Sequence, residues 1–179
     1  MSSELELEFS GLATDKIWMR QCIEIAKSNV DPIGNKTVGA VMMGFSRGLY
    51  TGCRHTFINH NNVPHKTIHA EQFIIWEAGE DARGAELYVT MEPCAKRWHN
   101  NSNYHYPSCV EYIIRAGIKK VYIGKLDKDF GGGGVQALLK AGVQVVHVLG
   151  MEKDIAALNE NQRVEPIVQE EFKEFINEV

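Results

Sequence analysis

The sequence predicts a single three-layer α/β/α domain built around a mixed five-stranded sheet. In its second half, short apolar runs alternate with helical patterns, which is typical of parallel strands covered by helices on both faces. Two earlier apolar runs, over 38–44 and 49–53, flank a short Ser-Arg-Gly turn and therefore predict an antiparallel pair. At 179 residues, with 44% hydrophobic and 23% charged residues, the chain fits one ordinary globular domain.

The first third of the chain contains one clear helix. Residues 5–9 alternate between apolar side chains and glutamates, which indicates either a short edge strand or a loose acidic tail. A helix follows over about 14–28, because Thr14 can cap its start and its apolar residues, Cys22 among them, fall on one face. After the antiparallel pair, residues 54–66 are expected to form a loop.

The remaining elements alternate between helix and strand. Glycines at positions 79 and 117 mark the ends of two helices. The expected helices are 68–79, 109–117 and 134–142, and the expected strands are 86–91, 121–126 and 143–149. We therefore divide the chain into an N-terminal tail or edge strand (1–13), one domain (14–150) and an extension of the same domain by one or two acidic helices (151–179).

The bulk composition argues against several classes of protein. A net charge of -4 and the lack of a Lys/Arg-rich flank argue against a nucleic-acid-binding groove. No apolar run reaches the length of a membrane helix, and the acidic N-terminus lacks the features of a secretory signal. We therefore expect an intracellular, cytoplasmic protein whose 4 cysteines are free, catalytic or metal-bound rather than disulfide-bonded.

Three potential metal ligands lie at the ends of expected elements, where side chains can converge. His69 stands near the start of a helix, Cys94 follows a strand and a proline, and Cys109 opens the next helix. One histidine and two thiolates suit one zinc ion per chain and leave its fourth position open, which is the catalytic arrangement. By contrast, Cys22 on an apolar helix face and Cys53 at a strand end are interpreted as structural.

Glu71 adds a proton-transfer group to this set. It lies two residues after His69 and so points to another side of the helix, where it need not bind the metal. A His-x-Glu motif followed by Pro-Cys and a further cysteine is the signature of zinc deaminases. In such sites zinc acidifies a water molecule, the resulting hydroxide attacks the ring carbon that carries an amino group, and the glutamate shuttles protons until ammonia leaves. Each motif alone is common by chance; their order and placement make the combination informative.

Longer motifs support a resemblance to a known family. The sequence resembles the pyrimidine deaminase domain of riboflavin biosynthesis, found in bacterial deaminase/reductases and fungal riboflavin deaminases, within the cytidine deaminase-like superfamily. HAEQ and TMEPC are similar to the fungal version, and the likeness spans about 14–150. The motifs that carry it are NKTVGAV (35–41), HAE (69–71), EAGEDARGAELYVTMEPC (77–94), CVEYIIRAGIKKV (109–121) and GGGGVQALLKAGV (131–143).

The resemblance implies further contacts and an assembly. The side-chain amide of Asn35, the backbone N–H groups of Ala70 and Cys94 and the carbonyl of Glu92 would face the substrate. Asn35 has a second interpretation, as a turn residue before the strand. Members of the superfamily commonly form dimers or tetramers, so the resemblance also implies a homodimer or higher homo-oligomer.

The segment between the two candidate cysteines, 95–108, is longer than in the family. It has two interpretations: a lid that binds a phosphate, a ribityl chain or a stacked base, or a plain surface insertion. A histidine of this segment could also replace Cys109 as the third ligand, although Pro107 and Ser108 still introduce the expected helix. Its basic and aromatic residues are Lys96, Arg97, Trp98, His99, Tyr104 and His105.

The leading hypothesis is a zinc-dependent deaminase of a small aminopyrimidine, with a ribosyl- or ribityl-amino diaminopyrimidinone phosphate as the first candidate substrate. The alternatives are a free base or nucleoside (cytosine, cytidine or a guanine-like base), a specialised metabolite, a tRNA or single-stranded DNA base, and a non-catalytic zinc module. The four glycines at 131–134 do not form a P-loop, because no Gly-Lys-Ser/Thr follows. Residues 151–179 are too few for a reductase domain, so a stand-alone deaminase or a fragment is expected.

Overall fold

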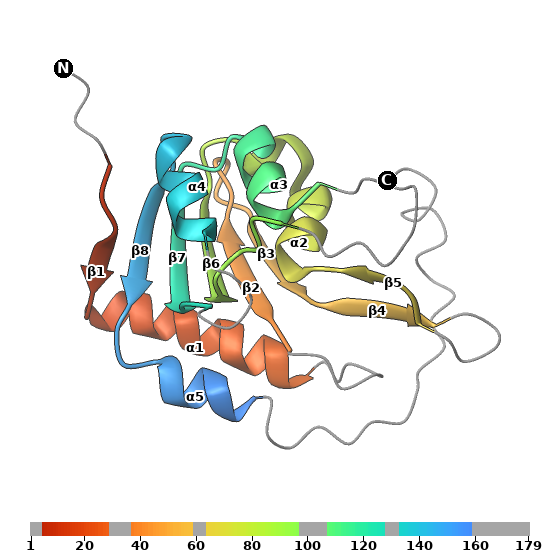
Figure 1. Ribbon diagram of the computed structural model, residues 1–179, viewed down its shortest axis with the longest axis horizontal. Coiled ribbons are helices and arrows are strands. Elements are labelled where there is room, and N and C mark those ends of the chain that lie inside the picture. The colour runs from red at the N-terminus through yellow and green to blue at the C-terminus, as the bar shows by residue number, and fades with distance from the viewer. Residues whose placement is uncertain (1–4, 29–36, 59–63, 97–106, 128–132, 159–179) are drawn as a thin grey trace.

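A computed structural model of the chain describes residues 5–28, 37–58, 64–96, 107–127 and 133–158 (Figure 1). Its helices are α1 (Ala13–Ser28), α2 (Ala70–Ala78), α3 (Cys109–Ala116), α4 (Gly134–Lys140), α5 (Glu152–Ala157) and the short 3-10 helix η1 (Gly79–Ala82). Its strands are β1 (Glu8–Ser10), β2 (Gly39–Met43), β3 (Leu49–Cys53), β4 (His55–Ile58), β5 (Pro64–Ile68), β6 (Glu86–Met91), β7 (Lys120–Lys125) and β8 (Gln144–Val148). Every helix and strand expected between 14 and 150 is present, with small shifts at the ends.

Within the described residues the main sheet is mixed, as predicted, but it has six strands rather than five. The strand order is β1-β8-β7-β6-β2-β3. The pairs β6–β7, β7–β8 and β8–β1 are parallel, and β2 pairs antiparallel with both β3 and β6. The additional strand is β1, so the edge-strand interpretation of the N-terminal segment is confirmed; at 3 residues it was too short to be distinguished from a tail.

The prediction that residues 54–66 form a loop is wrong for part of that range. Strands β4 and β5 pair antiparallel with each other and form a separate two-stranded sheet. Their sequences, His-Thr-Phe-Ile and Pro-His-Lys-Thr-Ile, mix polar and apolar residues without a clean alternation, so the periodicity that identifies the other strands is missing. The second of them leads directly to His69 and α2.

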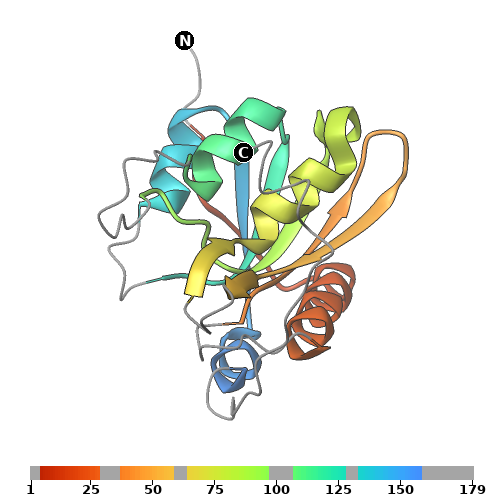
Figure 2. The same cartoon turned by 90° about the vertical axis from the view of Figure 1, so that its right-hand side faces the viewer.

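Helices cover both faces of the main sheet and bury a hydrophobic core on each side (Figures 1 and 2). Because successive side chains of a strand point to opposite faces, Leu87 and Val89 of β6 join the core beneath α2, α3 and α4. Tyr88 between them joins the core beneath α1 and α5, where Cys22 is also fully buried. The three-layer α/β/α prediction is therefore confirmed.

Cys22 packs inside this second core, as expected for a structural thiol. Its Sγ donates a hydrogen bond to the carbonyl oxygen of Tyr88 at 3.5 Å, and burial raises the pKa of the thiol well above its ordinary value.

Among the described residues, no helix is long and apolar enough to cross a membrane. Of the C-terminal extension, residues 151–158, which include α5, are described, and 159–179 lie outside the described residues.

Gly39 allows α1 to pack tightly against β2, and we expect Gly39→Ala to lower the free energy of unfolding by about 3 kcal/mol. A Cβ atom at this position would overlap the carbonyl oxygen of Cys22, and a helix backbone cannot yield cheaply. Thermal or denaturant unfolding measures the loss. Gly11→Ala is the matched control, because nothing lies within 4 Å of a Cβ placed there. Equal stability of the two variants would contradict this account of the packing.

Candidate metal centre

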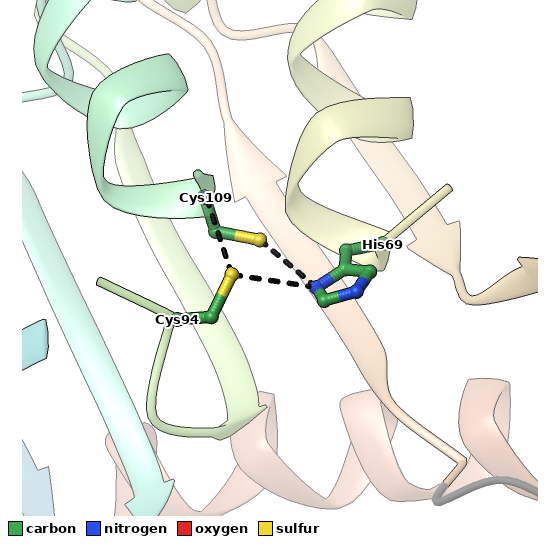
Figure 3. A group of neighbouring side chains, drawn as sticks. All are labelled: His69, Cys94 and Cys109. Carbon is green, nitrogen blue, oxygen red and sulfur yellow. Dashed lines mark hydrogen bonds between the residues drawn. The ribbon is translucent and has the colours of Figure 1, made fainter. Parts of the chain in front are cut away.

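Three side chains from three separate elements converge at one end of the sheet (Figure 3). His69 is the N-cap of α2, Cys94 follows β6 after Glu92 and Pro93, and Cys109 is the first residue of α3. The Nδ1 atom of His69 lies 3.7 Å from the Sγ of Cys94 and 3.2 Å from the Sγ of Cys109. All three potential ligand atoms lie within 4.8 Å of one another.

These distances fit one zinc ion. With ordinary Zn–S and Zn–N bond lengths and tetrahedral angles, a sulfur and a nitrogen ligand lie about 3.6 Å apart, close to both observed separations. One imidazole and two thiolates also form a set of ligands that zinc binds well. His69, Cys94 and Cys109 are therefore placed to bind a zinc ion, and among the described residues the group of converging donor atoms does not include Glu71.

The two thiols differ in their tendency to ionise. The hydrogen bond from the Cys109 thiol lowers the pKa of Cys94 to about 4, and the His69 side chain and the Cys109 backbone N–H contribute in the same direction. That N–H donates to the Sγ of Cys94 at 3.4 Å. Burial raises the pKa of Cys109, which is fully buried. Of the two thiols, Cys94 is therefore the one that ionises more readily.

The start of α3 holds Cys109 in place. Ser108 and Glu111 form a capping box, in which the Ser108 Oγ accepts from the backbone N–H of Glu111 at 3.3 Å and a carboxylate oxygen accepts from the N–H of Ser108 at 2.7 Å. One residue into the helix, the N–H of Val110 donates to the carbonyl oxygen of Cys94 at 3.2 Å. The two cysteines are thus connected through the backbone despite the long segment between them in sequence.

Glu71 is the second residue of α2 and lies inside the protein with only 3% of its surface exposed. Burial raises the pKa of its carboxyl group above the ordinary value, and the electrostatic interaction with the His69 side chain partly opposes this shift. Buried carboxyl groups with raised pKa values beside a metal centre are typical of general acid–base residues, because they can both take up and release a proton near neutral pH.

Glu92 uses its side chain to fasten the loop that carries Cys94. One carboxylate oxygen accepts from the backbone N–H of Asp127 at 3.0 Å, and the other accepts from that of Val135 at 3.1 Å. Gly134 permits this close approach, because a Cβ there would overlap the carbonyl oxygen of Pro93. The resemblance suggested a role for the carbonyl of Glu92 and none for its carboxylate, since nothing in the local sequence identifies hydrogen-bond partners so far along the chain.

Two of the other candidate binding residues lie within the described part of the chain. Ala70 is fully buried as the first residue of α2, and Lys96 is exposed at the end of a described segment. The remaining ones lie outside the described residues, and so does the alternative ligand in the long segment: Asn35, Arg97, Trp98, His99 and His105. Cys53, interpreted as structural, is half-buried with its Sγ 3.5 Å from the Nε2 of His55.

Gln72 is a further polar residue at the site, and no sequence pattern predicted its position there. It is 2% exposed, and its side-chain oxygen accepts from the backbone N–H of His69 at 3.0 Å. A glutamine three residues after the N-cap is half of a capping-box signature, but the signature requires serine or threonine at the cap itself. With histidine at that position, the pattern was not recognisable.

Comparison with known proteins identifies relatives of this architecture. A riboflavin biosynthesis protein RibD from Synechocystis is 35% identical over 146 residues, which cover 80% of this chain and 35% of the relative. The chain thus spans about a third of the length of that curated relative.

Solved structures agree in fold as well as in sequence. A Thermotoga maritima diaminohydroxyphosphoribosylaminopyrimidine deaminase/5-amino-6-(5-phosphoribosylamino)uracil reductase is 32% identical with a TM-score of 0.62, covering 82% of this chain and 38% of that chain. The Aspergillus oryzae Rib2 deaminase in complex with DARIPP is 26% identical with a TM-score of 0.58, covering 82% of this chain and 90% of that chain.

A family model covers the metal centre directly. The model of the cytidine and deoxycytidylate deaminase zinc-binding region matches residues 12–125, a span that includes α1 through β7 and all three converging ligands. The match agrees with the donor geometry, which by itself fits zinc. By fold, ligand geometry and sequence, this chain belongs to the cytidine and deoxycytidylate deaminase zinc-binding family.

Proposed function

We propose that this chain is a zinc-dependent hydrolytic deaminase of a diaminopyrimidinone that carries a ribosyl- or ribityl-amino phosphate arm, as in riboflavin biosynthesis. The observation that carries the proposal is the convergence of His69, Cys94 and Cys109, together with the buried carboxyl group of Glu71, which interacts with all three side chains. Three ligands leave one position of a four-coordinate zinc ion open, and Glu71, the candidate acid–base group, lies two residues after the ligand His69.

The chemistry divides between the metal and the protein. When bound, zinc supplies a Lewis acid that lowers the pKa of a water molecule and makes it a nucleophile near neutral pH. The two protons of the attacking water pass in turn through the carboxylate of Glu71: the first goes to the ring nitrogen and the second to the departing amino group, which leaves as ammonia. The raised pKa of Glu71, caused by burial, supports this role because the group holds a proton more readily than an exposed glutamate. The His69 ring presents Nδ1 to both sulfurs and is held by the cap position of α2.

The substrate is inferred from the relatives. The Thermotoga enzyme is named for a phosphoribosylated aminopyrimidine, and the Aspergillus deaminase is described in complex with DARIPP. Their identities of 32% and 26% over most of this chain support a shared substrate class. We further propose that Asn35, Lys96, Arg97, Trp98 and His99 contact the substrate, with the basic residues facing its phosphate.

The assembly and location of the protein complete the proposal. We propose a homodimer or higher homo-oligomer, which is the common form in the superfamily. We also propose a cytoplasmic location and a small-molecule substrate; the net charge of -4 favours such a substrate over a nucleic acid. Residues 14–150 would form the deaminase domain, with 151–179 as its extension.

An ammonia-release assay over a small panel of substrates tests this proposal. The panel contains the diaminopyrimidinone ribosylamino and ribitylamino phosphates, their dephosphorylated forms, cytosine, cytidine, guanine and a tRNA pool. We expect kcat/KM to be highest for a phosphorylated diaminopyrimidinone, at least about tenfold above its dephosphorylated form, because a charge-assisted contact to phosphate is lost in the latter. Preference for cytosine, cytidine, guanine or tRNA would contradict the proposed substrate.

A further inference from the structure

Gln72 joins two ligand-bearing segments of the metal centre. Its Oε1 accepts from the backbone N–H of His69 at 3.0 Å, while its Nε2 donates to the carbonyl oxygen of Pro107 at 3.1 Å. Pro107 lies two residues before Cys109 in sequence. A single side chain, 2% exposed, therefore connects the start of α2 to the start of α3.

The chemistry of the two partners makes an amide the suitable side chain here. A backbone N–H can only donate and a carbonyl oxygen can only accept, so the group between them must offer one acceptor and one donor. An ionised glutamate offers only acceptors, and an aliphatic side chain offers neither. Because Gln72 is almost completely buried, an unpaired partner would not recover its hydrogen bond from bulk water.

The remaining connections of the centre explain why this link matters. Cys94 and Cys109 are tied together by the backbone N–H groups of Cys109 and Val110, which donate to the sulfur and the carbonyl oxygen of Cys94. His69 belongs to α2, a different helix. The link through Gln72 spans the interval between the histidine ligand and the pair of cysteines.

We propose that Gln72 is a positioning residue that fixes His69 relative to Cys109 and so sets the geometry of the metal centre. This inference rests on the proposed function, in which these residues hold the catalytic zinc. Gln72 does not contact the reacting atoms in this account; it acts through the ligands on either side.

Two substitutions separate the two hydrogen bonds. When ionised, the carboxylate of Gln72→Glu keeps the acceptor for the N–H of His69, and so keeps the helix cap, but loses the donor to Pro107. Gln72→Met keeps the length of the side chain and loses both hydrogen bonds. Asp81→Asn is the control for general destabilisation: Asp81 accepts from the backbone N–H of Ser46 at 2.6 Å and from the Tyr50 hydroxyl at 3.0 Å, on elements that carry no metal ligand.

The measurement is the dissociation constant for Zn²⁺, obtained by competition with a chromophoric chelator, together with the absorption spectrum of the Co²⁺-substituted protein. We expect about tenfold weaker Zn²⁺ binding in Gln72→Glu and a larger loss, up to about a hundredfold, in Gln72→Met. The Co²⁺ spectra of both variants should change, since thiolate and imidazole ligands are displaced, whereas Asp81→Asn should bind both metals as the wild type does. If Gln72→Met does not fold, Gln72→Glu, with its cap intact, carries the test.

Wild-type affinity and spectra in both Gln72 variants would overturn the inference, and so would an equal loss of metal in Asp81→Asn. The proposed function fails by a different result: a wild-type protein that binds zinc but releases no ammonia from any substrate. The metal-binding comparison does not depend on turnover, so the two failures are distinguishable.

Discussion

Replacing Glu71 with glutamine lowers kcat for ammonia release by about a hundredfold to ten-thousandfold, which is the usual contribution of a general acid–base group. Glutamine has nearly the same size and fits the same buried position, but it cannot take up or deliver a proton. Steady-state ammonia release with the zinc-loaded variant measures the effect. Zinc content should stay at the wild-type level, because the three ligands are unchanged.

The stability of this variant distinguishes a catalytic defect from a folding defect. Burial raises the pKa of Glu71 in the folded protein. Ionisation of this group therefore opposes folding once the pH exceeds the pKa that Glu71 has in the unfolded chain. A glutamine at this position carries no such penalty, and Glu71→Gln should therefore unfold at the same or a higher temperature at neutral pH. The control is Glu77→Gln on the exposed side of α2, which should keep full activity. Turnover by Glu71→Gln at the wild-type rate would refute the proton-shuttle assignment.

Replacing Cys109 with alanine removes one of three zinc ligands, and zinc content should fall from about one equivalent per chain to a small fraction of that value. Cys109 is fully buried at the start of α3, so another donor cannot take its position without moving the helix. Activity should disappear together with the metal. Elemental analysis of the purified variant and its ammonia release are the two measurements.

His99→Ala and His105→Ala are the matched comparisons for this prediction. Each removes a potential ligand from the segment between the cysteines, and each should retain about one zinc per chain. The opposite pattern, with zinc retained in Cys109→Ala and lost in one histidine variant, would transfer the third ligand to that segment and contradict the assignment of His69, Cys94 and Cys109.

Periodicity and motif spacing predicted the central fold and the metal ligands. Strand β6 is buried on both faces and is therefore an almost continuous apolar run in sequence. Its predicted limits agree with the observed ones, Glu86–Met91. The three-residue β1 was ambiguous and the β4–β5 pair was missed, since both depend on pairing partners rather than on an apolar pattern of their own.

At the site, the three potential metal ligands could be predicted from the sequence, and the residues that hold them could not. His69, Cys94 and Cys109 lie at element ends that the sequence revealed, and the family signature indicated Glu71 as the candidate proton shuttle. The contacts of Glu92 with Val135, and of Gln72 with Pro107, join segments distant in sequence. Such links arise only when the layers pack, so no local pattern records them.

Ammonia release from the phosphorylated diaminopyrimidinone, measured before and after metal removal, tests the central claim most directly. The claim predicts turnover by the zinc-loaded protein, its loss after treatment with a chelator, and its recovery when Zn²⁺ is restored. Turnover that persists in fully metal-free protein, or a zinc-loaded protein that releases no ammonia from this substrate, would contradict the account.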